Sequence, residues 1–204
     1  MKKTDNYAIQ AAQAQAHFLT YDQDAILRKF RLEADGEYFY PVLLGSRYRL
    51  SRTTGQLQRQ CGGAWVDGNS YNEVMTLLDM LCDAREDRYL TGRWNSMQNF
   101  GLMFHKDLLE DKRDRDAERY DRDPAALHRG CATLGGRPIG CADIGYAIEL
   151  FDGLEIGLQF WHGDEDFPPR LRYLWDENAL AYIRYETMYF AVSLLLQRLR
   201  EAGD

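Results

Sequence analysis

The stretch from residue 146 to residue 161 constrains the fold most, because apolar side chains recur there at every second position. In the first run these are Tyr146, Ile148 and Leu150, and in the second they are Leu154, Ile156, Leu158 and Phe160. A period of two is typical of strands with one buried face. Since Asp152-Gly153 separates the runs, the pattern predicts a β-hairpin.

The pairing within this hairpin depends on the length of its loop. A two-residue loop would place Phe151 opposite Leu154 and Glu149 on the apolar face of Ile156. A three-residue loop, residues 151–153, pairs Leu150 with Leu154 and Ile148 with Ile156. We therefore expect the longer loop, with Gly153 in the left-handed conformation and a bulge.

A third strand and a covering helix are expected after the hairpin. Leu171, Tyr173 and Trp175 alternate with Arg170 and Arg172, which predicts a strand beside the second one. A sheet with one apolar face needs a cover. Residues 187–200 can provide a helix for it, with Thr187 as its cap.

The first half of the chain predicts an antiparallel meander between helices. Turn residues separate the expected strands, at residues 32–34, 38–44, 47–50 and 56–58. The expected helices cover residues 5–19, a short segment that Asp22 or Asp24 begins, and residues 70–83. The last has a capping box, Ser70 to Glu73, at its start.

The middle of the chain is less regular. Residues 84–104 lose their periodicity, which predicts an ordered loop that holds Trp94 and offers room for a pocket. Residues 105–122 are highly charged and predict either a solvated helix or a mobile connector. Asp123-Pro124 begins a further helix that ends at Gly135-Gly136.

These elements together predict one α+β domain that spans residues 1–204. We expect one mainly antiparallel sheet, to which the N-terminal meander and the C-terminal strands both contribute. Helices 5–19, 70–83 and 187–200 cover it.

Composition limits the possible partners. The formal net charge of −7 argues against nucleic acid, and there is no apolar run long enough for a membrane span. We expect a cytoplasmic protein. Cys61, Cys82, Cys131 and Cys141 lack zinc or iron–sulfur spacing, so they are expected to be small buried thiols, and no cofactor can be identified. The oligomeric state stays open.

Several motifs resemble one bacterial family. They are the run from His162 to Asp176, the run from Tyr182 to Thr187, the N-terminal Asn6 to Ala12 and the central Leu90-Thr-Gly-Arg-Trp94. Together they are similar to the family called domain of unknown function 3786. The resemblance implies a cytoplasmic domain of anaerobic bacteria with no established catalytic residues. Some relatives carry an iron–sulfur cysteine cluster, and this chain departs from that pattern.

An acidic turn is the first candidate site. His162, Asp164, Glu165 and Asp166 could hold a divalent metal with one imidazole and several carboxylates. In the alternative interpretation, the carboxylates accept hydrogen bonds from backbone N–H groups in a turn stiffened by prolines.

A second candidate site combines arginines with aromatic rings, which can hold an anionic or planar ligand. Its expected members are Trp94, Arg170, Arg172, Tyr173, Trp175 and Arg184. Alternatively, the arginines form ion pairs with Asp164 to Asp166.

The chain has neither a Gly-x-Ser-x-Gly elbow nor a nucleotide-binding glycine loop. We therefore expect a non-catalytic binding or accessory domain for a small ligand or a partner protein. The alternative is a metal-dependent enzyme that uses the acidic turn from His162 to Asp166.

Overall fold

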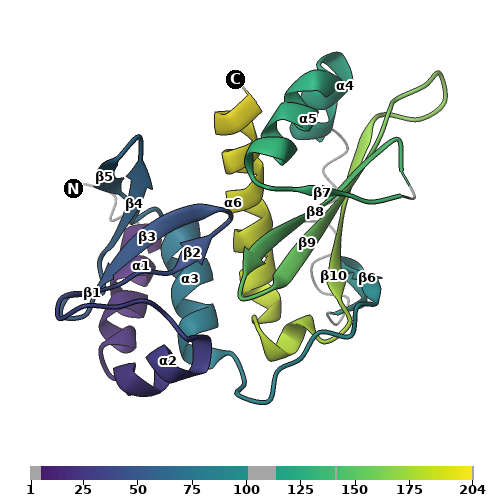
Figure 1. Cartoon of the computed structure of the whole chain (residues 1–204). Coiled ribbons are helices and arrows are strands. Elements are labelled where there is room, and N and C mark those ends of the chain that lie inside the picture. The colour runs from purple at the N-terminus through teal and green to yellow at the C-terminus, as the bar shows by residue number, and fades with distance from the viewer. Residues whose placement is uncertain (1–5, 101–113, 141, 204) are drawn as a thin grey trace. The chain divides into compact units, whose positions relative to one another are not determined.

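The structure, a computed structural model, describes residues 6–100, 114–140 and 142–203. Its contacts divide the chain into two compact units. Unit 1 contains the residues up to Arg88 together with Ala181–Ala191, and unit 2 contains Tyr89–Leu180 and the residues from Val192 onward. Each unit combines helices with an antiparallel sheet (Figure 1), which confirms the α+β class. The number of domains stays a prediction.

Unit 1 contains the predicted meander. Its elements are α1 (Asn6–Phe18), α2 (Gln23–Phe30), β1 (Tyr38–Phe39), β2 (Val42–Leu43), β3 (Ser46–Ser51), β4 (Leu57–Cys61), β5 (Ala64–Asp67) and α3 (Tyr71–Asp83). The strand order is β1-β3-β4-β5, and β2 also pairs with β3. Residues 32–34, predicted as a strand, contribute only the bridge from Ala34 to Phe39. β5 has no counterpart among the predicted strands.

Side-chain caps begin two helices of unit 1 as expected. The Asp22 carboxylate accepts a hydrogen bond from the Ala25 N–H at 3.0 Å, so Asp22, not Asp24, begins α2. The Ser70 hydroxyl accepts one from the Glu73 N–H at 3.4 Å and begins α3. Each cap satisfies a backbone donor that the helix leaves open.

The inner face of the first sheet forms the core of unit 1. Phe39, Tyr48 and Leu50 are fully buried there. Phe18 of α1 meets Phe39 edge to face, with ring centroids 6.1 Å apart. The Tyr48 hydroxyl donates a 2.8 Å hydrogen bond to Glu73 of α3. The sheet is therefore joined to both helices, by ring packing to α1 and by a buried hydrogen bond to α3.

Unit 2 contains the second sheet. Its elements are β6 (Trp94–Ser96), the 3-10 turn η1 (Met97–Asn99), α4 (Arg115–Arg122), α5 (Pro124–Thr133), β7 (Arg137–Pro138), β8 (Ile144–Phe151), β9 (Leu154–Trp161) and β10 (Arg170–Asp176). A second 3-10 turn, η3 (Ala179–Ala181), follows, and α6 (Tyr185–Gly203) contributes residues to both units. The strand order is β6-β10-β9-β8-β7. The third strand is confirmed beside the second, but the two sets of strands form separate sheets, so the expectation of one shared sheet was wrong.

The β8–β9 hairpin differs from its predicted register in its last pairs. Ile148 pairs with Ile156 as predicted, but Phe151 instead of Leu150 pairs with Leu154. Asp152 and Gly153 form a two-residue loop with φ of 54° and 79°. The register shifts between Glu149 and Phe151, and this bulge lets a tight turn coexist with a solvent-facing Glu149. The left-handed Gly153 is confirmed.

The helices of unit 2 confirm some predicted boundaries and correct others. The charged run forms a helix over Arg115–Arg122, and its Tyr120 is buried, so this helix is not wholly solvated. Residues 105–113 lie outside the described residues. Asp123 begins α5, since its carboxylate accepts from the Ala126 N–H at 3.1 Å. Thr187 is not a cap, because α6 begins at Tyr185 and the Thr187 hydroxyl hydrogen-bonds Asp79.

The cysteines are only partly buried. Cys131 is buried and Cys82 is half-buried, but Cys61 is exposed at the end of β4, where the prediction of a buried thiol was wrong. Cys141 lies outside the described residues. No helix within the described ranges has the length and apolar character needed to cross a membrane.

Candidate functional site

Strand β10 places the predicted ligand residues on two faces of the second sheet. Tyr173 and Trp175 are buried on the face where α4 packs. Burial raises the pKa of the Tyr173 hydroxyl well above its usual value. Arg170 and Arg172 alternate with them and are exposed on the opposite face. Tyr173 and Trp175 are therefore core residues that the sheet separates from the arginines.

Trp94 lies on the same face as these arginines. It belongs to β6, where it pairs with Asp176 of β10, so the prediction of a loop was wrong at this residue. A Cβ atom on Gly157 would lie 3.1 Å from Cζ3 of the indole and 3.0 Å from Cβ of Leu174. Only glycine lets the ring lie this close to β9. The Trp94 side chain nevertheless stays 37% exposed.

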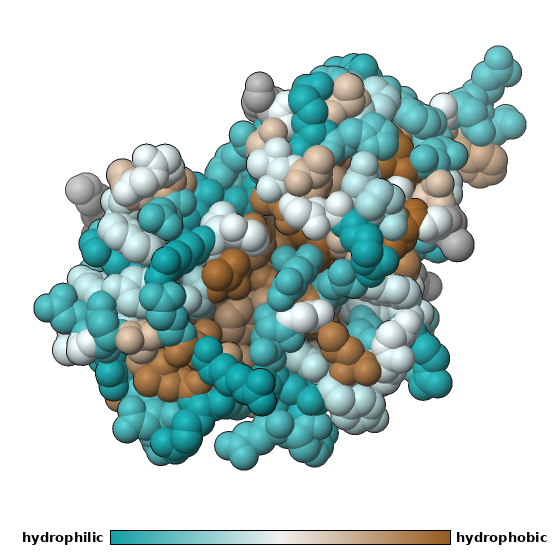
Figure 2. Space-filling model, in the orientation of Figure 1, coloured by the Kyte–Doolittle hydropathy of each residue, from teal (hydrophilic) through white to brown (hydrophobic). Residues whose placement is uncertain are grey.

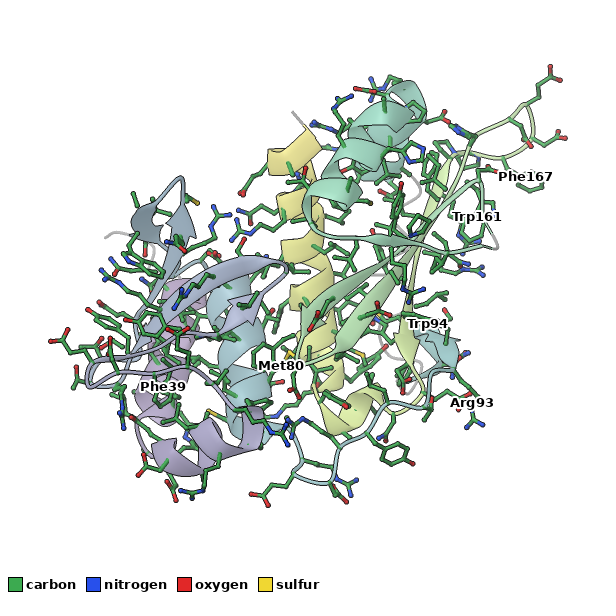
Figure 3. All side chains as sticks on the ribbon, in the orientation of Figure 1. Phe39, Met80, Arg93, Trp94, Trp161 and Phe167 are labelled. Carbon is green, nitrogen blue, oxygen red and sulfur yellow. The ribbon has the colours of Figure 1, made fainter. Side chains whose placement is uncertain are left out.

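A second indole lies further along β9. The Arg172 guanidinium lies over the Trp161 ring, 5.4 Å from its centroid, and Arg170 is the cross-strand neighbour of Trp161. We call the surface formed by Trp94, Leu174, Arg172, Arg170 and Trp161 the indole face. In Figure 3, Trp94 and Trp161 lie on one side of this sheet. Trp161 lies four positions after Gly157 in β9, so the backbone positions beside the two indoles are about 13 Å apart.

The carboxylate of Asp176 holds the segment before Trp94 in position. It accepts hydrogen bonds from the N–H groups of Gly92 and Asn178, each at 2.8 Å, and from the Thr91 hydroxyl. Burial alone would raise the pKa of Asp176, but the hydrogen bonds that stabilise its charged form leave the pKa lowered. The Glu177 N–H also donates to the Arg93 carbonyl at 2.9 Å. This network fixes the approach of β6 to β10.

Comparison with known proteins gives the same family as the motifs in the sequence. A profile of the family described as domain of unknown function (DUF3786) matches residues 22–198. The chain belongs to the DUF3786 family. Neither the curated proteins nor the solved structures contain a match. Two of the motifs that resemble DUF3786, Leu90 to Trp94 and His162 to Asp176, are adjacent in this fold because β6 pairs with β10.

His162 of the acidic turn binds residues outside that turn. Its ring Nδ1 lies 2.8 Å from Oδ1 of Asp121 in α4, and its backbone N–H donates to Asp143 at 2.8 Å. The hydrogen bond from His162 is the largest cause of the lowered pKa of Asp121. The contact with Asp121 attaches the end of β9 to α4, and the contact with Asp143 attaches it to the residue before β8.

The carboxylates of the turn form a different arrangement. Oδ1 of Asp164 accepts hydrogen bonds from the N–H groups of Asp166 and Phe167, at 2.9 and 2.7 Å, as in the alternative interpretation. Glu165 and Asp166 are exposed, and Figure 2 shows hydrophilic residues at this protruding tip. Within the described part of the chain, no three His, Cys, Asp or Glu side chains are grouped as a metal site requires.

Arg184 belongs to unit 1 and directly precedes α6. Its Nε lies 3.2 Å from Asp79, and its Nη2 lies 2.5 Å from Asp83. Asp79 has a raised pKa, chiefly because it is buried. The alternative interpretation, in which the arginines pair with Asp164 to Asp166, is therefore wrong for Arg184, since α3 provides its carboxylates.

Three residues of this region were not among the predicted site residues: Trp161, Leu174 and Gly157. Trp161 occupies an outward position in the alternation of β9, together with Gly157, and this signal was available in the sequence. The close approach of Trp94 to β9 had no such signal, because the strand at residues 94–96 is too short to show a recognisable period.

Proposed function

We propose that this DUF3786 chain is a non-catalytic binding or accessory domain of the bacterial cytosol, and that the indole face binds a partner protein. The observation that carries the proposal is the position of Trp94 and Trp161 on one face of the sheet, with Arg172 between them. Tryptophan and arginine are the residues most enriched where binding energy concentrates in protein interfaces.

The spacing of the indole face favours a protein over a small ligand. The backbone positions beside its two indoles are about 13 Å apart along β9, so a partner must extend over several residues to contact both. Trp94 and Arg172 both expose side-chain surface. The arginine stacked on Trp161 is partly ordered before binding, which lowers the entropy cost of an interface.

A metal-dependent enzyme at the acidic turn is the alternative. The contacts around this turn favour it less, because Asp164 caps backbone N–H groups and the ring of His162 contacts Asp121. These hydrogen bonds occupy Oδ1 of Asp164 and Nδ1 of His162, two of the atoms that a cation could use.

Site-specific photo-cross-linking in a bacterial host tests the proposal. Benzoylphenylalanine at position 174 lies within the indole face, and the same residue at position 165 lies on the acidic tip. We expect one protein to be cross-linked from position 174 and not from position 165. Equal cross-linking from both positions, or none from position 174, would contradict the proposal.

A further inference from the structure

The outer face of the first sheet carries aromatic rings interleaved with arginines. The register places Tyr38, Arg47, Arg49 and Trp65 on this face, opposite to the buried Tyr48 and Leu50. In Figure 1 the strands β1 to β3 lie in front of α1 and α3, and Figure 2 shows mainly hydrophilic and neutral residues there. We call Tyr38, Tyr40, Arg47, Arg49 and Trp65 the guanidinium cluster.

Arg49 is held between two rings of this cluster. Its guanidinium carbon lies 4.7 Å from the centroid of Tyr38 and 4.9 Å from the centroid of Trp65. Its Nε donates a 2.6 Å hydrogen bond to the Gln58 amide oxygen. Contacts from β1, β4 and β5 thus converge on one side chain. They restrict its rotamers before any ligand arrives, which reduces the entropy cost of binding.

Arg47 differs from Arg49 in its partners. Arg47 lies over the Tyr40 ring at 4.8 Å and forms a 2.8 Å ion pair with Glu33. For Arg49, no carboxylate of the described residues lies within ion-pair distance, and its two terminal nitrogens donate to no atom of the described chain. The positive charge of Arg49 and its paired N–H donors are therefore available to a ligand.

We propose that Arg49 is the anion-binding group of a second site, and that this site takes a small molecule with one carboxylate or phosphate group and an aromatic part. The terminal nitrogens match the two oxygens of such a group in bidentate geometry. The half-exposed rings of Tyr40 and Trp65, with centroids 6.3 Å apart, offer apolar surface to the aromatic part.

The surroundings of the cluster select against a polyanion. Glu33 and Asp35 flank it, and Asp35 accepts a 2.6 Å hydrogen bond from the Tyr40 hydroxyl. The pKa of Asp35 is lowered, mainly by this hydrogen bond. These charged carboxylates, beside Arg47 and Tyr40, would repel the successive phosphates of a nucleic acid. A ligand with one isolated anionic group therefore fits this cluster better than a polyanion does.

An NMR titration of the whole chain tests this inference. The probes are benzoate, phenyl phosphate and inorganic phosphate, with benzyl alcohol as a neutral analogue, and the reporter is the indole N–H of Trp65, assigned with Trp65→Phe. We expect saturable shifts with benzoate, with phenyl phosphate or with both, and none with benzyl alcohol. The stronger binder of the two aromatic anions identifies the anionic group. Saturation with inorganic phosphate alone, or with no probe, overturns the proposal.

Two variants and one control test whether ligand binding depends on the paired N–H donors of Arg49. Arg49→Lys keeps the charge but loses the paired donors, and we expect it to weaken binding about tenfold. Trp65→Leu keeps the arginine and removes one ring, and is expected to weaken binding about threefold. Because Trp65→Leu lacks the Trp65 indole, the reporter for this variant is the Tyr38 ring. The exposed Arg28→Lys is the matched control. Equal affinities in all four proteins would overturn the proposal.

Discussion

The Asp176 carboxylate accepts a 2.8 Å hydrogen bond from the backbone N–H of Gly92, a residue 84 positions earlier in the chain. This contact joins two of the motifs that resemble DUF3786, Leu90 to Trp94 and His162 to Asp176. The indole face exists because the segment that ends at Trp94 is fixed against β10.

Replacing Asp176 with asparagine tests this relationship. Asparagine keeps the shape but loses the charge that accepts several N–H donors, so we expect the free energy of unfolding to fall by about 1–3 kcal/mol. Urea denaturation followed by circular dichroism measures it. Asp166→Asn on the exposed tip is the control and should change stability by less than about 0.5 kcal/mol. Equal stabilities of the two variants would count against an anchoring role for Asp176.

The same carboxylate predicts a pH dependence. The folded pKa of Asp176 is lowered from its ordinary value of 3.8, so the unfolded state takes up the proton more readily. Its stabilising effect is complete above the unfolded pKa and is lost as pH falls through the folded pKa. The stability difference between the wild type and Asp176→Asn should shrink below about pH 4. A difference that grows on acidification would contradict this sign.

Gly157→Ala tests the close approach of Trp94 to β9. The new methyl group would lie 3.1 Å from the indole, so the ring must shift, and we expect a loss of about 1–3 kcal/mol together with a change in Trp94 fluorescence. Difference spectra against Trp94→Phe isolate that signal. Gly140→Ala, where a Cβ meets no atom within 4 Å, is the control. Unchanged Trp94 emission would mean that the indole does not lie over β9.

Gly153→Ala tests the corrected hairpin turn. Gly153 has a φ of 79°, where alanine is strained, so the variant should lose about 1 kcal/mol of stability. Gly36→Ala, which has open space around its Cβ position, serves as the comparison. A Gly153→Ala protein as stable as the wild type would exclude a left-handed residue at this turn.

Calorimetric titration addresses the metal-dependent alternative. Because Asp164 accepts two backbone hydrogen bonds, we expect manganese and zinc to give no heat beyond dilution. Saturable heat that disappears in His162→Ala and Asp164→Asn would instead support a metal site at the acidic turn.

Local signals predicted the longer helices and strands, but not the short strands β5, β6 and β7. The capping residues Ser70 and Asp123 marked true helix starts because a cap acts within three residues. A bulge was predicted at the loop with Gly153, but it lies between Glu149 and Phe151, because side-chain alternation does not show where an extra residue is inserted. The division of strands into two sheets depends on long-range packing that a single sequence does not display.

The candidate site could be predicted in part. Arg170, Arg172 and Trp94 do share one face, and the alternation of β10 already implied that Tyr173 and Trp175 point the other way. The position of Arg184 followed from no local pattern, because its partners Asp79 and Asp83 lie about a hundred residues earlier.

The central claim is that the indole face binds a partner protein, and the affinity of the cross-linked partner for variants of this face tests it most directly. Trp161→Ala removes the ring under Arg172, and Phe167→Ala removes a 71% exposed ring from the neighbouring tip as the control. We predict that Trp161→Ala raises the Kd about thirtyfold, as expected for an interface residue worth about 2 kcal/mol, and that Phe167→Ala leaves the Kd unchanged. An unchanged Kd for Trp161→Ala would contradict the account.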